Sequence, residues 1–247
     1  MLIDVHCHLH EYSDEEVSEI LSLFKGVIVS VGDDEESSRR NLDLASRYPG
    51  RVIPCLGLHP WEVKGRDSVE EARRIAELIV EQGVPCIGEV GLDKKFCPQT
   101  IDVQREVFNV FLEAAAETGA MLNIHSPKAW REVLDAALRA GVKRLNFHWY
   151  TGPVELLEEI EAQGYTVSVN PALRIQAKHR LVVEHAPLEM ILTESDAPYK
   201  YRGMRLTPLM IPMVIREIAA IKGVSPDVVE RVVARNASRL LSLPHLA

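Results

Sequence analysis

One structural unit recurs along the whole sequence: a short apolar run followed by a segment with helical periodicity. Runs rich in Val, Ile and Leu predict strands, and the amphipathic segments between them predict helices. Strands that are apolar throughout are typical of a parallel sheet covered on both faces. The predicted strands are residues 2–7, 27–31, 52–57, 86–90, 121–125, 144–148, 165–169 and 190–194.

The segments between these strands have the length of helices, and glycine marks several of their ends, as at Gly83 and Gly119. The predicted helices include residues 68–82, 100–118, 129–140, 153–163 and 225–241. Eight strand–helix units in 247 residues match the size of an α/β protein of the (β/α)8 TIM-barrel type. A doubly wound open sheet is the alternative, and it would gather its site at a single switch point.

Potential metal ligands stand where five of the predicted strands stop. His6 and His8 are separated by one residue, so on a strand their imidazoles point to the same side. The ligands at the other strand ends are Glu89, His125, His148 and Asp196. A barrel brings all of its carboxyl strand ends together, which an open sheet does not. We therefore predict one (β/α)8 barrel domain over residues 1–247 with a metal site at that face.

The six residues suit two divalent ions. Glu89 is central among the ligand strands and is expected to bridge the ions. His6, His8 and Asp196 would complete one site, and His125 and His148 the other. Neutral imidazoles with carboxylates favour Zn²⁺, Mn²⁺ or Ni²⁺ over Mg²⁺.

Two ions of this kind can activate a water molecule and stabilise a leaving oxygen. We therefore expect a hydrolase with Glu89 and Asp196 as catalytic residues, in which Asp196 can also accept the proton of the water. Glu194, two residues earlier, is the competitor for that role as base. The alternative interpretation of Glu194 is a buried residue that pairs with a neighbouring His or Lys.

The charge balance limits the partners. A net charge of −8 is the reverse of what a protein that coats nucleic acid needs, so a polyanionic substrate requires metal ions and local cations. The candidate cations in loops after strands are Lys94, Lys95, Lys128, Lys200, Arg202 and Arg205. The sequence lacks an apolar run of the ~20 residues that span a membrane, and it predicts no oligomeric state.

The four cysteines, Cys7, Cys55, Cys86 and Cys97, form no C-x-x-C pair. Three of them fall in predicted strands, which favours small buried side chains over disulfides or zinc thiolates. Cys7 is expected to face away from His6 and His8, which argues against ligation. A reducing, cytoplasmic location is the simplest expectation, and the chain opens on a strand rather than a signal peptide.

Six segments resemble motifs of the TatD-type metal-dependent deoxyribonucleases of the amidohydrolase superfamily, in the order found there. They are residues 4–9 (DVHCHL), 57–60 (GLHP), 88–93 (GEVGLD), 123–126 (NIHS), 147–152 (FHWYTG) and 192–199 (LTESDAPY). The resemblance covers nearly the whole chain. It implies that the two-metal ligands of the family fall on the same six residues and its acid on Asp196. It also implies that His59 contacts a substrate phosphate.

Members of this family cleave phosphodiester bonds in DNA, often at 3′ ends, with Mg²⁺, Mn²⁺ or Zn²⁺. The resemblance therefore implies two divalent ions and a DNA or small phosphodiester substrate, with contacts expected from His59, Lys128, Arg202 and Arg205. The departures concern the substrate side. Pro127 replaces an arginine of the family, the stretch Arg205-Leu206-Thr207-Pro208 replaces Arg-Asn-Glu-Pro, and Trp149 alters the motif after His148. The missing arginine removes one bidentate phosphate contact.

Two other functions remain open. The first is a hydrolase of the same superfamily that acts on a C–N or lactone bond. Many such enzymes bridge their metals with a carboxylated lysine, whereas this chain has Glu89. The second is a barrel that keeps its metals but only binds a nucleotide or a protein. The negative charge favours that reading, and the complete ligand set opposes it.

Overall fold

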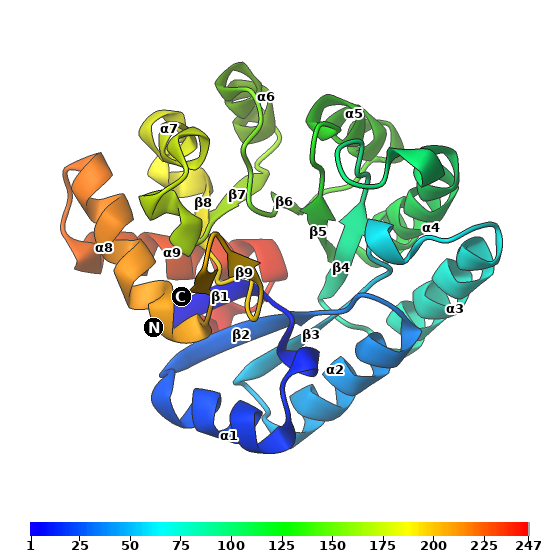
Figure 1. Ribbon diagram of the computed structural model, residues 1–247, viewed down its shortest axis with the longest axis horizontal. Coiled ribbons are helices and arrows are strands. Elements are labelled where there is room, and N and C mark those ends of the chain that lie inside the picture. The colour runs from blue at the N-terminus through cyan, green and yellow to red at the C-terminus, as the bar shows by residue number, and fades with distance from the viewer. Residues whose placement is uncertain (247) are drawn as a thin grey trace.

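The computed structural model describes residues 1–246, and within them eight strands form one parallel sheet in the order β1 to β8 (Figure 1). Ala247, the last residue of the predicted domain, lies outside the described residues. The strands are β1 Leu2–Cys7, β2 Gly26–Val31, β3 Val52–Leu56, β4 Cys86–Gly91, β5 Met121–His125, β6 Leu145–Phe147, β7 Thr166–Val169 and β8 Ile191–Thr193.

The two outer strands of this sheet meet, so the sheet curls into a nearly closed barrel. The N–H of Asp196 donates to the carbonyl of His6 at 2.9 Å, and the N–H of His8 donates to the carbonyl of Ala197 at 2.8 Å. The predicted TIM barrel is confirmed. Each observed strand begins and ends within one residue of its prediction.

Helices surround the strands, as the ring of ribbons in Figure 1 shows. They are α1 Asp14–Leu23, α2 Glu35–Arg47, α3 Asp67–Gln82, α4 Ile101–Thr118, α5 Trp130–Ala140, α6 Leu157–Ala162, α7 Ala177–His185, α8 Ile211–Lys222 and α9 Pro226–Leu241. The helix predicted over residues 153–163 begins as a 3₁₀ turn, Val154–Leu156, before α6. All residues of β2 and β4 are buried, as expected for strands with helices outside and a packed barrel inside.

A short hairpin after β8 was not predicted from the sequence. It pairs β9 (Lys200–Tyr201) with β10 (Met204–Arg205) in antiparallel fashion. Arg202 and Gly203 form its turn with positive φ angles of 48° and 86°, the backbone sign required at both central positions of a type I′ turn. The hairpin places Tyr201 at the mouth of the barrel, where it lines the main pocket.

The expectation that no cysteine forms a disulfide is wrong for one pair. Cys55 on β3 and Cys86 on β4 are bonded, with their Cα atoms 4.5 Å apart. They are register partners on adjacent parallel strands, so their side chains start from matched positions. This pairing depends on the register of two strands, which the sequence pattern did not reveal. Cys7 and Cys97 are free and buried, in agreement with the prediction for them.

Across residues 1–246, the helices are too short or too polar to cross a bilayer.

Candidate metal centre

The predicted ligands gather at the carboxyl ends of the strands, around the floor of a pocket of about 440 Å³. We call His6, His8, Glu89, His125, His148 and Asp196 the ligand cluster. None of their side chains is more than 11% exposed. The structure therefore brings together all six residues that the sequence singled out.

Glu89 lies at the centre of the ligand cluster, and its two carboxylate oxygens face different imidazoles. Oε2 is 3.0 Å from Nε2 of His6 and 3.4 Å from Nε2 of His8. Oε1 is 2.7 Å from Nδ1 of His125 and 3.3 Å from Nε2 of His59. Gly91, two residues after Glu89 in β4, permits the close approach of β5, because a Cβ there would collide with the carbonyl of His125. A carboxylate in this position can bridge two ions.

Asp196 follows β8 in a left-handed conformation, with φ of 55°, which aspartate tolerates better than most residues. Its Oδ1 is 3.7 Å from Nε2 of His6 and 3.6 Å from Nε2 of His8. His6, His8 and Asp196 can thus surround one cation, as the sequence predicts.

His148 lies between the two halves of the ligand cluster. Its ring stacks on His6 with centroids 3.7 Å apart, and its Nε2 is 3.8 Å from Glu89 and 3.9 Å from Asp196. Within the described chain, His6, Glu89 and His148 form one possible metal group, and His59, Glu89 and His125 form another. The geometry therefore adds His59 to the group around His125, where the sequence expected only His125 and His148.

These distances fit donor atoms that share an ion. Two ligand atoms on a tetrahedral ion with bonds of about 2.1 Å lie about 3.4 Å apart. Nε2 of His6 is buried and has no hydrogen-bond partner in the described residues, although it points at Glu89 and Asp196. A buried nitrogen left in this state calls for a ligand, and a cation between these groups would satisfy it.

Each imidazole of the ligand cluster has a protein group on its other side. Nδ1 of His6 faces Oδ1 of Asn123 at 3.1 Å, and the amide of Asn123 is oriented by its own bond to the Val5 carbonyl. Nε2 of His125 faces Asp93 at 2.9 Å, and Nδ1 of His148 faces Glu194 at 2.9 Å. Such partners fix the tautomer of a ligating histidine and leave the opposite nitrogen free for metal.

Asp33 and Asp93 are carboxylates beside the ligand cluster that the sequence reasoning missed. Asp33 lies 3.1 Å from Nδ1 of His8 and completes the set of outer partners. Each of the two follows the last residue of its strand by two positions, at β2 and β4. An acid two residues beyond a ligand-bearing or neighbouring strand is the signal that could have indicated them.

The charges in the cluster support one another. Burial would raise the pKa of Glu89, but the imidazoles that surround its carboxylate hold that pKa well below its ordinary value, so Glu89 is ionised. Burial would lower the pKa of His148, but the carboxylates of Glu194 and Glu89 raise it to about 9. Protons and metal ions therefore compete for this imidazole, and metal binding would release protons.

His59 has a different protonation state from His148. Its Nδ1 accepts a hydrogen bond from the N–H of Trp61 at 3.0 Å, so this nitrogen carries no proton. Burial lowers the pKa of the ring below its ordinary value, which keeps it neutral. The proton of the neutral ring therefore resides on Nε2, which faces Glu89 and the pocket. In this tautomer Nε2 of His59 can donate a hydrogen bond to Glu89 or to a group in the pocket.

Aromatic side chains from several loops wall the pocket above the ligand cluster. We call Trp61, Phe96, Trp130, Trp149, Tyr199 and Tyr201 the aromatic rim. Trp149 is held by a hydrogen bond from its indole nitrogen to Gln176 and lies edge-on to Tyr201 at 5.1 Å. The sequence did not predict the aromatic rim, because its members come from loops whose approach depends on the closed barrel.

The predicted cations divide between the pocket and the outer surface. Lys128 and Lys95 line the pocket, together with Lys178, which the sequence reasoning missed. Arg202 lies over the ring of Tyr201, and Arg205 lies 3.8 Å from Glu16; neither lines the pocket of the described chain. Lys94 pairs with Glu132, and Lys200 is exposed on β9.

The comparison with protein families gives a match over nearly the whole chain. A family model described as TatD related DNase matches residues 3–242. An uncharacterized metal-dependent hydrolase of Methanocaldococcus jannaschii is 31% identical over 245 residues, which are 96% of this chain and 95% of that protein. The human deoxyribonuclease TATDN3 is 28% identical over 269 residues, covering 99% of this chain and 96% of its own length.

Solved structures show the same fold. The TatD homolog YjjV from Escherichia coli aligns with a TM-score of 0.85 at 23% identity, with 98% of each chain covered. A TatD-family hydrolase from Entamoeba histolytica aligns with a TM-score of 0.80 at 17% identity, with 97% of each chain covered.

Proposed function

The chain belongs to the TatD-related DNase family of metal-dependent hydrolases, and we propose that it hydrolyses phosphodiester bonds in DNA or in small nucleotide substrates. The observation that carries this proposal is the position of Glu89. Its two oxygens face two different sets of imidazoles across the floor of an open pocket. Binding a single structural ion would not require this arrangement.

The ligand cluster would hold two divalent ions, with Glu89 between them. When bound, such a pair of ions supplies a water nucleophile at neutral pH and stabilises charge on the leaving oxygen. The imidazoles fit Zn²⁺, Mn²⁺ or Ni²⁺, and the presence of histidine in each group makes an all-oxygen ion such as Ca²⁺ a poorer fit.

Asp196 is better placed than Glu194 to accept a proton during the reaction. Asp196 lines the pocket, so its carboxylate can be reached by water and substrate. Glu194 is fully buried and already accepts hydrogen bonds from the N–H of Trp149 and the hydroxyl of Ser168, and it contacts His148. Glu194 thus orients His148, the second of the two readings considered for it.

His59 would donate a hydrogen bond to the substrate. Its Nε2 proton points toward the space in front of Glu89, and its ring lines the pocket. A neutral donor there can contact a phosphate oxygen without competing for a metal ion. This is the role that the resemblance implied for His59.

The walls of the pocket favour a substrate that carries both phosphate and a flat ring. The aromatic rim offers π-faces on which nucleobases stack with little sequence preference. Lys95, Lys128 and Lys178 provide positive charge beside them. The volume of about 440 Å³ lies in the range of ordinary small-molecule sites and would accept one nucleotide unit.

The proposal is tested by a substrate panel with Mn²⁺, Zn²⁺ and Mg²⁺ added separately. We expect cleavage of single-stranded DNA and of bis(4-nitrophenyl) phosphate, and we expect chelation to abolish it. In Glu89→Ala activity should be lost together with bound metal, whereas Glu81→Gln, an exposed glutamate on α3, serves as the matched surface control. Hydrolysis of amides or lactones without phosphodiester cleavage would support the first alternative, and metal binding without hydrolysis the second.

A further inference from the structure

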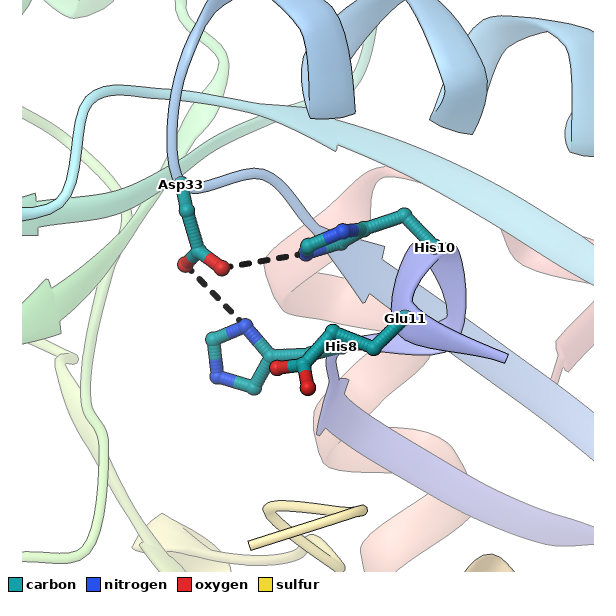
Figure 2. A group of neighbouring side chains, drawn as sticks. All are labelled: His8, His10, Glu11 and Asp33. Atoms are coloured by element: carbon teal, nitrogen blue, oxygen red, sulfur yellow. Dashed lines mark ion pairs between the residues drawn. The ribbon is translucent and has the colours of Figure 1, made fainter. Parts of the chain in front are cut away.

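A second group of metal-binding side chains lies on the far side of His8 from Glu89. It consists of His8, His10, Glu11 and Asp33, which come from the end of β1, the 3₁₀ helix Leu9–Glu11 and the loop after β2 (Figure 2). Ligand atoms of these four side chains all lie within 4.8 Å of one another. The proposed hydrolysis requires none of His10, Glu11 or the outer oxygen of Asp33.

Asp33 connects the two histidines through different oxygens. Its Oδ1 is 3.1 Å from Nδ1 of His8, and its Oδ2 is 3.2 Å from Nε2 of His10, as the dashed lines of Figure 2 show. Nε2 of His8 faces Glu89 and Asp196, and its Nδ1 faces Asp33 without a hydrogen bond in the described residues. Oδ1 of Asp33 thus faces His8, and Oδ2 faces His10.

The nitrogen that faces this second oxygen has no hydrogen bond. Nε2 of His10 is buried and unpartnered in the described residues, although it is 3.2 Å from the carboxylate. The His10 side chain as a whole is only 10% exposed. The buried imidazole nitrogen thus lies next to a carboxylate oxygen without a hydrogen bond between them. Two metal ligands that share an ion have this arrangement.

The two carboxylates lack the usual cationic partners. In the described part of the chain, the ion pairs of Asp33 are with His8 and His10 alone, and neither Asp33 nor Glu11 forms one with a lysine or arginine. Glu11 is exposed at the end of a short 3₁₀ helix, so its carboxylate can adjust its position at low cost. The group therefore offers the oxygens of two carboxylates and one imidazole nitrogen to a cation.

We propose that His10, Asp33 and Glu11 form a third divalent-cation site, separate from the pair of ions held by the ligand cluster. One imidazole and two carboxylates suit Zn²⁺ or Mn²⁺ and leave open positions for water, as in sites with three protein ligands. His8 lies between the third site and the ligand cluster, with Nδ1 facing Asp33 and Nε2 facing Glu89.

The third site shares the pocket with the ligand cluster. His8, Glu11 and Asp33 all line it, on the wall that they form beside the metal pair. A cation there would add positive charge beside the carboxylates of Glu11 and Asp33. Such a cation could contact a phosphate group of a substrate in the pocket. It would supply positive charge in a chain that has Pro127 where the resemblance expects an arginine.

The test counts bound ions and needs no substrate, so its outcome is independent of the proposed phosphodiesterase activity. Metal-free protein is equilibrated with buffered Zn²⁺, and in parallel with Mn²⁺, dialysed and measured by elemental analysis. We expect three ions per chain in the parent, two in His10→Ala and one in Glu89→Ala. The matched control His185→Ala removes an exposed histidine on α7 and should keep three ions.

Two results would overturn the proposal: a parent protein that saturates at two ions, or a His10→Ala variant that retains the parental ion count and affinities. Circular dichroism shows whether each variant is folded. If His10→Ala does not fold, Glu11→Gln replaces it, because Glu11 is exposed and its loss leaves the core intact. That variant should weaken the binding of one ion by about tenfold or more while the other two bind as in the parent. If Glu11→Gln binds all three ions as tightly as the parent does, the third site is rejected.

Discussion

The ligand cluster and the aromatic rim belong to the same pocket but are built in different ways. The ligand cluster stands on strand ends, is buried, and has a protein group behind each imidazole. The aromatic rim comes from loops, from the first residue of α5 and from the hairpin strand β9, and several of its members are much more open: Trp61 is 42%, Phe96 57% and Tyr199 44% exposed. The cluster is thus held in place by the barrel itself, whereas the rim is positioned by contacts between loops.

This difference separates the chemistry of the protein from its choice of substrate. Side chains on rigid elements with fixed outer partners keep the geometry that metal binding demands. Loop residues can change without disturbing the barrel, and loops are where related barrels differ. We therefore expect substitutions in the ligand cluster to act on turnover and metal content, and substitutions at the rim to act on substrate binding.

The largest effect on turnover without loss of the fold is expected from Asp196→Asn. Asparagine keeps the shape and one coordinating oxygen but removes the charge and the basicity. Loss of a general base typically lowers turnover by ~10²–10⁴-fold. The measurement is kcat on a phosphodiester with metal content determined on the same sample. Near-parental activity with metal bound would show that Asp196 is not the base.

A smaller effect is expected from Asp93→Asn, which weakens the support behind His125. Oδ2 of Asp93 lies 2.9 Å from Nε2 of His125, and it accepts a hydrogen bond from the indole N–H of Trp61 at 2.7 Å. Loss of an outer partner of this kind costs ~10–100-fold in metal affinity. Metal titration by calorimetry should show this loss in one ion only. If both ions of the pair bind as in the parent, His125 does not need Asp93 for its orientation.

His59→Ala separates a substrate contact from a metal ligand. The tautomer fixed by Trp61 makes His59 a donor, and removal of one neutral hydrogen bond should lower kcat/KM by roughly tenfold. Metal content should stay at the parental value. Loss of an ion in this variant would place His59 among the metal ligands. Unchanged kinetics would show that His59 does not contact the substrate.

The smallest effects are expected at the cations of the loops. Lys128→Ala should raise KM by about twofold to fivefold, since one exposed charge contributes little. Arg205→Ala should raise KM less, because Arg205 lies near Glu16 and outside the pocket lining. Steady-state kinetics on a short single-stranded oligonucleotide, at low and high salt, compares the two. A larger effect of Arg205 would mean that the hairpin moves over the bound substrate.

The sequence predicted the barrel and the six ligands because both follow from local pattern. Apolar runs identify strands, and in a barrel every carboxyl strand end reaches the same face, so His6 and Asp196 must approach one another although they are far apart in sequence. The central position of Glu89 among the imidazoles follows from its place on β4. No knowledge of loop conformation is needed for these conclusions.

The remaining features depend on geometry that local pattern does not contain. The Cys55–Cys86 disulfide requires the register of β3 against β4. Asp33 and Asp93 reach their histidines from loops, and the aromatic rim forms only when separate loops meet. Arg205 was predicted from its place after a strand to contact the substrate. In the structure it lies on the hairpin and faces Glu16, outside the pocket lining.

The central claim is that Glu89 bridges two ions, and anomalous diffraction tests it most directly. Crystals equilibrated with Mn²⁺ or Zn²⁺ should show two strong anomalous peaks about 3.5–4 Å apart at the ligand cluster. One peak should lie next to Oε1 of Glu89 and the other next to Oε2. A single peak at full metal saturation, or a pair of peaks of which only one contacts Glu89, would contradict the account.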